Sequence, residues 1–183
     1  MRVIAGEARG CGLVSPKGTA TRPTTDRLKE NLFNILSPRI SGARFLDLYS
    51  GSGAIGIEAM SRGAREAVLV ESAPAAIGAI KANLEKTRLG QRATLLSMSA
   101  ERALKELSQK NGVFDIIFMD PPYAKSIVSA TLSLLEQYPV LSENGIIVAE
   151  LSAQEAVPES AFKVRHSKTY GNTQFVFFEN GDV

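Results

Sequence analysis

The sequence predicts an α/β protein whose sheet is mostly parallel and covered by helices on both faces. From residue 44 onward, short apolar segments alternate with amphipathic segments of about 10–15 residues, which is the pattern of βαβ units. A glycine-rich turn follows the first apolar segment, and two strand-like runs near the C-terminus are joined by a Gly-Asn turn. A chain of 183 residues is long enough for one compact domain.

The individual elements follow from the spacing of apolar residues. The first strand leads through the glycine turn into a helix that carries Ile55, Ile57 and Met60. Pro74 suits the first turn of the next helix because that turn leaves backbone N–H groups unpaired. Strands are expected at 44–48, 66–70, 93–97, 114–119 and 145–150, further helices at 100–109 and 127–137, and a closing hairpin at 162–170 and 174–179.

The first 40 residues follow a different pattern. Extended pieces are expected at residues 2–5 and 12–15, and then a loop leads into a helix that Thr24 or Thr25 caps and that ends at Leu36. A segment of this size cannot bury a core alone. It is therefore expected to pack as a small β/helix extension on the rest of the chain.

Charge separates the same two parts. Residues 1–44 contain eight basic and three acidic residues, a net charge of +5, whereas the whole chain has +2. A basic arm on a slightly acidic body suits a polyanionic substrate, because contacts to phosphates supply affinity that does not depend on sequence. The expected division is a basic extension, 1–40, and an α/β domain, 41–183.

Composition excludes several classes of function. One cysteine, Cys11, cannot form an internal disulfide, and one histidine, His166, leaves too few ligands for a structural metal site. No G-x-S-x-G motif accompanies His166, so it is expected to be a solvated strand residue rather than part of a triad. No apolar run could span a bilayer, and the start of the chain lacks the apolar core of a signal peptide. A cytoplasmic monomer without membrane contact is expected.

The glycine turn is a candidate ligand site. Gly51, Gly53 and Gly56 satisfy the G-x-G-x-x-G pattern, which alone would also fit a nicotinamide dehydrogenase. A dinucleotide fingerprint normally has no carboxylate four residues before its first glycine, where this chain has Asp47. Glu71 ends the second strand, and open α/β sheets bind ligands at such ends. A carboxylate there suits a vicinal diol because it offers two acceptor oxygens side by side.

The end of the fourth strand is the most informative stretch. The strand at 114–119 runs into Asp120-Pro121-Pro122-Tyr123, and the prolines fix a rigid loop whose carbonyls point outward. Asp120 and the Pro121 carbonyl can then accept both N–H bonds of an exocyclic amine while Tyr123 stacks on its ring. The lone pair of an aromatic amine is delocalised, so two fixed acceptors raise its reactivity and stabilise the positive charge that develops when it attacks an electrophile.

Together these motifs resemble known methyltransferases. Asp47, the glycine turn and Glu71 resemble the cofactor site of class I S-adenosylmethionine-dependent methyltransferases, a Rossmann-like fold with a seven-stranded, mostly parallel sheet and a C-terminal hairpin. With the motif at 120–123, several further runs resemble the bacterial 16S rRNA (guanine(966)-N(2))-methyltransferase family over essentially the whole chain. These runs are RVIAG at 2–6, TRPTTDR at 21–27, LFNIL at 32–36, Glu58-Ala59 and SRGA at 61–64.

The resemblance implies methylation of the 2-amino group of a guanine in 16S rRNA, on the small ribosomal subunit or an assembly intermediate. The base would be flipped out of its stack to reach the site. No carboxylate follows the third strand, so Ser99 or a backbone amide would meet the adenine amino group. The resemblance assigns S-adenosylmethionine to Asp47, Ser50, Gly51, Gly53, Glu71 and Ser99, catalysis and base binding to Asp120, Pro121, Pro122 and Tyr123, and the RNA substrate to Arg2, Arg9, Arg22, Thr24, Thr25 and Arg27, with Arg22 and Arg27 also able to contact the cofactor carboxylate.

Other functions account for less of the sequence. A DNA adenine-N6 methyltransferase would use the motif at 120–123 but usually needs a separate target-recognition domain, for which 183 residues leave no room. A glutamine methyltransferase would be expected to have Asn in place of Asp120. A dehydrogenase has no role for residues 120–123, and a non-enzymatic RNA-binding module leaves both motifs unused.

Overall fold

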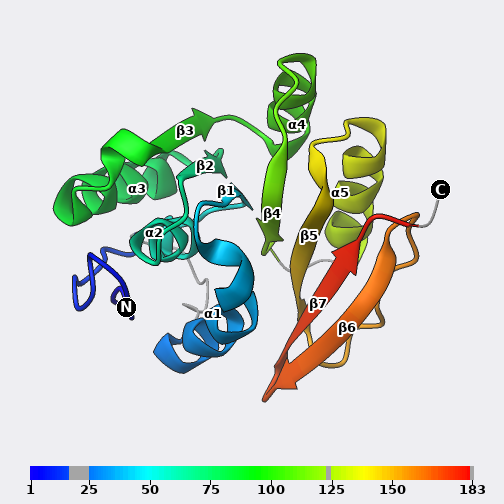
Figure 1. Cartoon of the computed structure of the whole chain (residues 1–183), viewed down its shortest axis with the longest axis horizontal. Helices are drawn as coiled ribbons and strands as arrows, with labels where there is room; N and C mark the ends of the chain where they lie inside the picture. The colour runs from blue at the N-terminus through cyan, green and yellow to red at the C-terminus, as the bar shows by residue number, and fades with distance from the viewer. Residues whose placement is uncertain (17–24, 123–124, 182–183) are drawn as a thin grey trace.

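A seven-stranded sheet forms the centre of the molecule (Figure 1). The computed structural model describes residues 1–16, 25–122 and 125–181. The strand order is β3-β2-β1-β4-β5-β7-β6, in which β1 to β5 are parallel and the β6–β7 hairpin is antiparallel. This order confirms the class I methyltransferase fold predicted from the sequence. The bounds are α1 (Asp26–Ile40), β1 (Arg44–Leu48), α2 (Ala54–Ser61), β2 (Glu66–Glu71), α3 (Pro74–Thr87), η1 (Gly90–Arg92), β3 (Ala93–Ser97), α4 (Ala100–Gln109), β4 (Phe114–Met119), α5 (Lys125–Gln137), β5 (Leu141–Ser152), β6 (Lys163–Tyr170) and β7 (Thr173–Glu179).

Helices cover both faces of the sheet, as the continuous apolar strands require. Helices α1, α2 and α3 pack on one face, and α4 and α5 pack on the other (Figure 1). Along β4, Ile116 and Phe118 belong to the apolar cluster of the α1–α3 face, while Ile117 and Met119 belong to the opposite cluster. This alternation assigns each residue at a strand end to one of the two faces.

The N-terminal segment is built into the same core. Arg2 and Gly12 form an antiparallel bridge, which places the two expected extended pieces side by side. Val3 and Leu13 are buried in one apolar cluster with α1, α2 and β1. Packing of residues 1–16 and of α1 on the rest of the chain is therefore observed, while the treatment of residues 1–40 as a separate unit stays a prediction.

Helix α1 is longer than the sequence analysis predicts. It ends at Ile40 rather than at Leu36, with Pro38 inside its last turn. Leu36 and Ile40 are both buried on the face that packs on the core. Burial of this extra turn outweighs the single backbone N–H that Pro38 lacks. The strand expected at 145–150 is also longer and spans Leu141–Ser152.

The residues excluded from catalysis have ordinary structural settings. His166 lies on β6 and stacks on Phe177, with ring centroids 4.4 Å apart. Cys11 is partly buried, and its Sγ lies 3.8 Å from the carbonyl oxygen of Lys86. Among the described residues, no group of three or more His, Cys, Asp or Glu side chains is arranged to hold a metal ion. In the same part of the chain, every helix is too short or too polar to cross a membrane.

Candidate active site

Four acidic residues lie at or next to the carboxyl ends of adjacent parallel strands. Residues two positions earlier, such as Phe118 on β4 and Val148 on β5, belong to the apolar cluster of the α1–α3 face. Side chains two apart along a strand share a face, so the carboxyl groups of Asp47, Glu71 and Glu150 belong to that face. Asp120 is the first residue after β4, and its charge acts on both Asp47 and Glu150. In the order of strands β2, β1, β4 and β5, this carboxylate row consists of Glu71, Asp47, Asp120 and Glu150.

The glycine turn joins β1 to the start of α2. Gly51 and Gly53 have φ values of 56° and 77°, a left-handed conformation that favours glycine. Tyr49 adopts φ 63° without being glycine, and its hydroxyl lies 2.7 Å from Thr131 Oγ1 on α5. Ser50 is buried, and its hydroxyl donates to the carbonyl oxygen of Asp47. The turn is thus fixed before any ligand binds.

Asp47 lies beneath the glycine turn rather than on its surface. The residue is 1 % exposed, and its Oδ2 accepts the backbone N–H of Gly56 at 3.0 Å. Loss of water raises the pKa of Asp47 to about 8; the Gly56 N–H opposes this shift, and the charges of Asp120 and Glu71 add to it. The protonation of Asp47 therefore depends on the charges of its neighbours in the carboxylate row.

Gly56 allows α2 to approach the sheet closely. A Cβ at this position would lie 2.2 Å from Leu69 Cδ2, and Leu69 is fully buried. We expect Gly56→Ala to lower the free energy of unfolding by about 1–2 kcal/mol, because overpacking outweighs the gain in helix propensity. Gly78→Ala on α3 is the matched control, since its Cβ would meet no atom within 4 Å. Urea denaturation measures both; equal effects at the two positions would contradict this account.

Glu71 is held by the backbone around it. Its Oε2 accepts the N–H of Gly51, and its Oε1 accepts those of Ser72 and Ala73, each at 2.8 Å. The carboxylate therefore stands at a fixed place between the glycine turn and the start of α3. Its side chain also forms part of the wall of a neighbouring cavity.

This cavity of about 260 Å³ has the properties of an adenosine site. Apolar side chains suit a purine ring, and the Glu71 carboxylate at the edge suits the vicinal hydroxyls of a ribose. Ser99 caps α4 by accepting the N–H of Arg102 at 3.4 Å and also lines the cavity. The residues present fit S-adenosylmethionine. The lining consists of Tyr49, Val70, Glu71, Ser72, Met98, Ser99, Ala100, Glu101 and Leu134.

The loop after β4 stands one strand away from Asp47. Asp120 is exposed as a residue, yet the protein around its carboxyl removes enough water to raise the pKa to about 6. Pro121 is buried and Pro122 is exposed. Tyr123 lies outside the described residues. The described part of the motif therefore places an acid and a following carbonyl on the edge of the sheet that also carries the glycine turn.

The basic residues expected to bind RNA are more scattered. Arg2 pairs with Asp26 at 2.9 Å, while Arg9 and Arg27 are exposed. Thr25 caps α1 by accepting the N–H of Leu28 at 3.2 Å. Arg22 and Thr24 lie outside the described residues.

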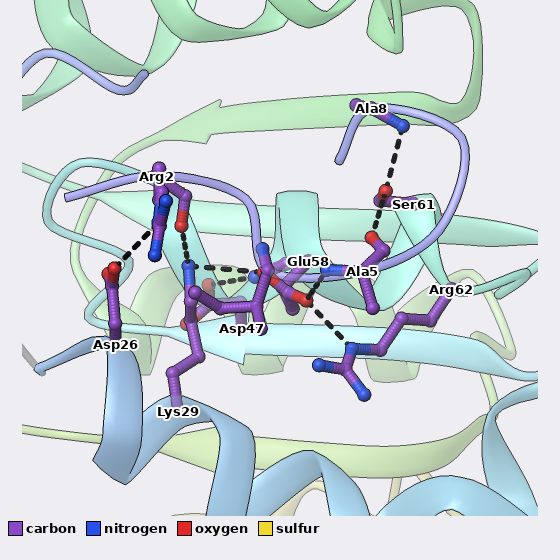
Figure 2. A network of polar contacts seen from close by, with 11 residues as sticks. Arg2, Ala5, Ala8, Asp26, Lys29, Asp47, Glu58, Ser61 and Arg62 are labelled. Atoms are coloured by element: carbon purple, nitrogen blue, oxygen red, sulfur yellow. Dashed lines mark hydrogen bonds and ion pairs between the residues drawn. The ribbon is translucent and has the colours of Figure 1, made fainter. Parts of the chain in front are cut away.

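A buried ionic network that sequence analysis missed fastens the N-terminal segment to α1 and α2 (Figure 2). Glu58 is fully buried and accepts the backbone N–H groups of Ile4 and Ala5 at 2.8 and 3.0 Å. Lys29 Nζ lies 3.1 Å and Arg62 Nε 2.7 Å from its carboxylate. Burial lowers the pKa of Lys29, and the charge of Glu58 opposes this shift. Lys29 and Glu58 lie in two different amphipathic helices, where charged residues are usually exposed, so the sequence did not indicate that they form a buried pair.

Asn83 joins the N-terminal segment to the glycine turn. Its side-chain amide accepts the N–H of Val14 at 2.7 Å and donates to the carbonyl oxygens of Val14 and Ser52, both at 2.9 Å. Asn83 is fully buried on α3. Sequence analysis did not single it out; its one available signal was a polar residue within an apolar helix face. Val14 is thus anchored, through Asn83, to the glycine turn.

Comparisons with known proteins agree with this fold. The family model described as Conserved hypothetical protein 95 matches residues 1–179. The Bacillus subtilis protein YlbH is 40% identical over 98% of both chains. Ribosomal RNA small subunit methyltransferase D of Escherichia coli K12 is 37% identical over 86% of this chain and 78% of its own. The solved structure of Escherichia coli yhhF matches with a TM-score of 0.86 and 33% identity, covering 99% of this chain and 98% of that one.

Proposed function

Because the chain belongs to the family described as Conserved hypothetical protein 95, we propose that it methylates ribosomal RNA at the exocyclic N2 amine of a guanine in the 16S rRNA. S-adenosylmethionine is the methyl donor and supplies an electrophilic methyl group. The curated relative from Escherichia coli is named for methylation of small-subunit rRNA, which supports the class of substrate.

One observation carries the proposal: acceptors for an amine stand beside a site that suits adenosine. Asp120 follows β4, Asp47 lies on the neighbouring β1, and Glu71 ends β2 next to the cavity. An amine held by Asp120 and the Pro121 carbonyl would therefore face a donor bound beside Glu71. Orientation of the two reactants is the main contribution such a site can make.

The residues of the chain have distinct tasks in this reaction. Glu71 binds the ribose hydroxyls, and the Ser50–Gly53 turn gives backbone contacts to the donor. Asp120 in its ionised form accepts an N–H of the amine, stabilises the positive charge that develops on nitrogen, and then takes the proton. The exposed basic residues Arg9 and Arg27, together with Arg2, contribute sequence-independent contacts to RNA phosphates.

Transfer of a labelled methyl group tests the function. Unmethylated small ribosomal subunits, free rRNA, duplex DNA and protein serve as parallel acceptors, followed by nucleoside analysis. Label in N2-methylguanosine of the 16S rRNA is the expected result. Label in N6-methyladenine of DNA would overturn the substrate, and no transfer to any acceptor by a protein that binds S-adenosylmethionine would contradict the proposal.

Glu71→Ala tests the donor site separately. We expect the affinity for S-adenosylmethionine to fall about 10- to 100-fold, because the variant loses a charged acceptor for the ribose and the anchor of the Gly51 N–H. Isothermal titration calorimetry measures the affinity without any RNA. Glu85→Ala, an exposed acid on α3, is the control and should bind like the wild type. Equal affinities of all three proteins would remove Glu71 from the donor site.

A further inference from the structure

Glu150, on β5, is the last member of the carboxylate row, and none of the roles described above uses it. Met119 on β4 pairs with Ala149 on β5, and Asp120 and Glu150 each come one residue later. Adjacent strands lie about 4.8 Å apart, so the two acids are neighbours. Glu150 Oε2 is buried, and none of the described residues gives it a hydrogen bond.

The two halves of the carboxylate row differ in how their charges are compensated. Glu71 accepts three backbone N–H groups, and Asp47 accepts one. Within the described ranges, no donor reaches the carboxyl groups of Asp120 or Glu150. Two neighbouring carboxylates without donors cannot both be ionised at low cost. One shared proton removes the repulsion between them and also gives the unpartnered oxygen a hydrogen bond.

The surroundings of the pair offer little other compensation. On β7, the residue opposite Glu150 is Phe175, and the charged residue opposite Phe175 on β6 is Lys168, one strand further away. On the other side, β1 contributes the acid Asp47. On α1, Lys29 is already paired with Glu58.

We propose that Asp120 and Glu150 share one proton at neutral pH, and that protonated Glu150 is a positioning residue which holds Asp120 as the single anion facing the amine. The shared proton is a property of the resting protein, whereas its importance for transfer rests on the proposed function. Glu150 Oε2 is buried without a donor among the described residues, whereas Asp120 is exposed as a residue, so Glu150 is the member that keeps the proton. Burial and the charge of Asp120 raise the pKa of Glu150 to about 8, which acts in the same direction.

The proton count of the reaction fits this arrangement. A nitrogen–carbon bond forms while the sulfur–carbon bond breaks and leaves its electron pair on sulfur. The methylated nitrogen then carries one proton too many, and the Asp120 carboxylate accepts it. The pair now holds two protons and no charge, and it returns one to water when the product leaves. Glu150 keeps its own proton throughout and directs its O–H to Asp120.

Carbon-13 NMR of labelled side-chain carboxyl groups tests the resting pair without RNA or cofactor. The Glu150 signal is identified by its absence in Glu150→Gln. We expect its titration midpoint in the wild type to lie near 8 and to move down in Asp120→Asn, because a neighbouring negative charge is gone. A Glu150 midpoint near that of an ordinary Glu, or one that Asp120→Asn leaves unchanged, would overturn the shared proton.

Kinetics on small ribosomal subunits test the positioning role. Glu150→Leu removes the donor, and we expect kcat to fall about tenfold or more while the affinity for S-adenosylmethionine stays unchanged. Glu150→Gln keeps an N–H donor and should recover most of this loss. In the wild type, kcat should fall above about pH 8 as Glu150 ionises, and Glu150→Gln should lack this alkaline limb. Glu143→Gln, an exposed acid at the other end of β5, is the control.

The two tests separate failure of the inference from failure of the function. Absence of transfer by the wild type, with a titration of Glu150 that depends on Asp120, would overturn the proposed function and leave the shared proton standing. Active wild type with an equally active Glu150→Leu would overturn the positioning role. Equal loss in Glu150→Leu and Glu150→Gln would contradict it too, because a donor at this position would then be irrelevant.

Discussion

Asp120→Ala is expected to reduce methyl transfer about 10²- to 10³-fold while the affinity for S-adenosylmethionine changes little. The loss follows from the removal of the acceptor that stabilises positive charge on the amine, a contact that strengthens as the new bond forms. Because the lost interaction belongs to the transition state, kcat and kcat/KM should fall by similar factors. Single-turnover transfer to unmethylated small subunits and calorimetry with the cofactor alone measure the two quantities.

Asp120→Asn sharpens this prediction. The amide keeps one acceptor oxygen and the size of the side chain but loses the charge and the ability to take a proton, so its activity should lie between those of the wild type and Asp120→Ala. The pKa of Asp120 is about 6, so wild-type activity should decrease as the pH falls through 6 and the carboxylate is protonated. Asp120→Asn should lack this acid limb. A loss of cofactor affinity in Asp120→Ala as large as that in Glu71→Ala would contradict the role assigned to Asp120.

The sequence predicts the parts of the site that depend on local pattern. The glycine turn, the Asp-Pro-Pro loop and the acid that ends β2 are each a short motif next to a strand with a clear apolar pattern. Their placement at carboxyl ends follows from the parallel sheet, and the pairing of β1 with β2 and β4 brings Asp47, Glu71 and Asp120 to one edge. The roles of these residues in binding and catalysis stay predictions.

The residues that sequence analysis missed depend on contacts between distant segments. The strand that ends in Glu150 was expected, but only the pairing of β4 with β5 reveals that this acid is the neighbour of Asp120. Asn83 acts on Val14 and Ser52, 69 and 31 residues away. Apolar periodicity has no means to indicate such partners. It also places the end of α1 too early, at Leu36, because it does not reveal that Ile40 is buried against the core.

Glu58→Leu is expected to have the largest effect on stability, a loss of about 3–5 kcal/mol in the free energy of unfolding. Leucine fits the apolar surroundings but leaves the Lys29 ammonium buried without its ion-pair partner and two backbone N–H groups without an acceptor. Urea denaturation measures this loss. Glu106→Gln, which breaks the exposed pair with Lys110 on α4, is the control and should change the unfolding midpoint little.

Lys29→Met, alone and combined with Glu58→Leu in a double variant, shows which charge the network depends on. Lys29→Met leaves Glu58 with Arg62 and the N–H groups of Ile4 and Ala5, so it should cost less than Glu58→Leu. Adding Lys29→Met to Glu58→Leu removes the unpaired ammonium and should restore part of the stability, while the two backbone donors stay unpaired.

Hydrogen exchange locates the remaining damage: the amides of Ile4 and Ala5 should exchange faster in both variants that carry Glu58→Leu. If Glu58→Leu costs no more than Lys29→Met, or if those amides stay protected, Glu58 does not anchor the N-terminal segment. If they open while the fold persists, affinity for S-adenosylmethionine should survive and affinity for the ribosomal subunit should fall, because the basic segment is then no longer held against α1 and α2.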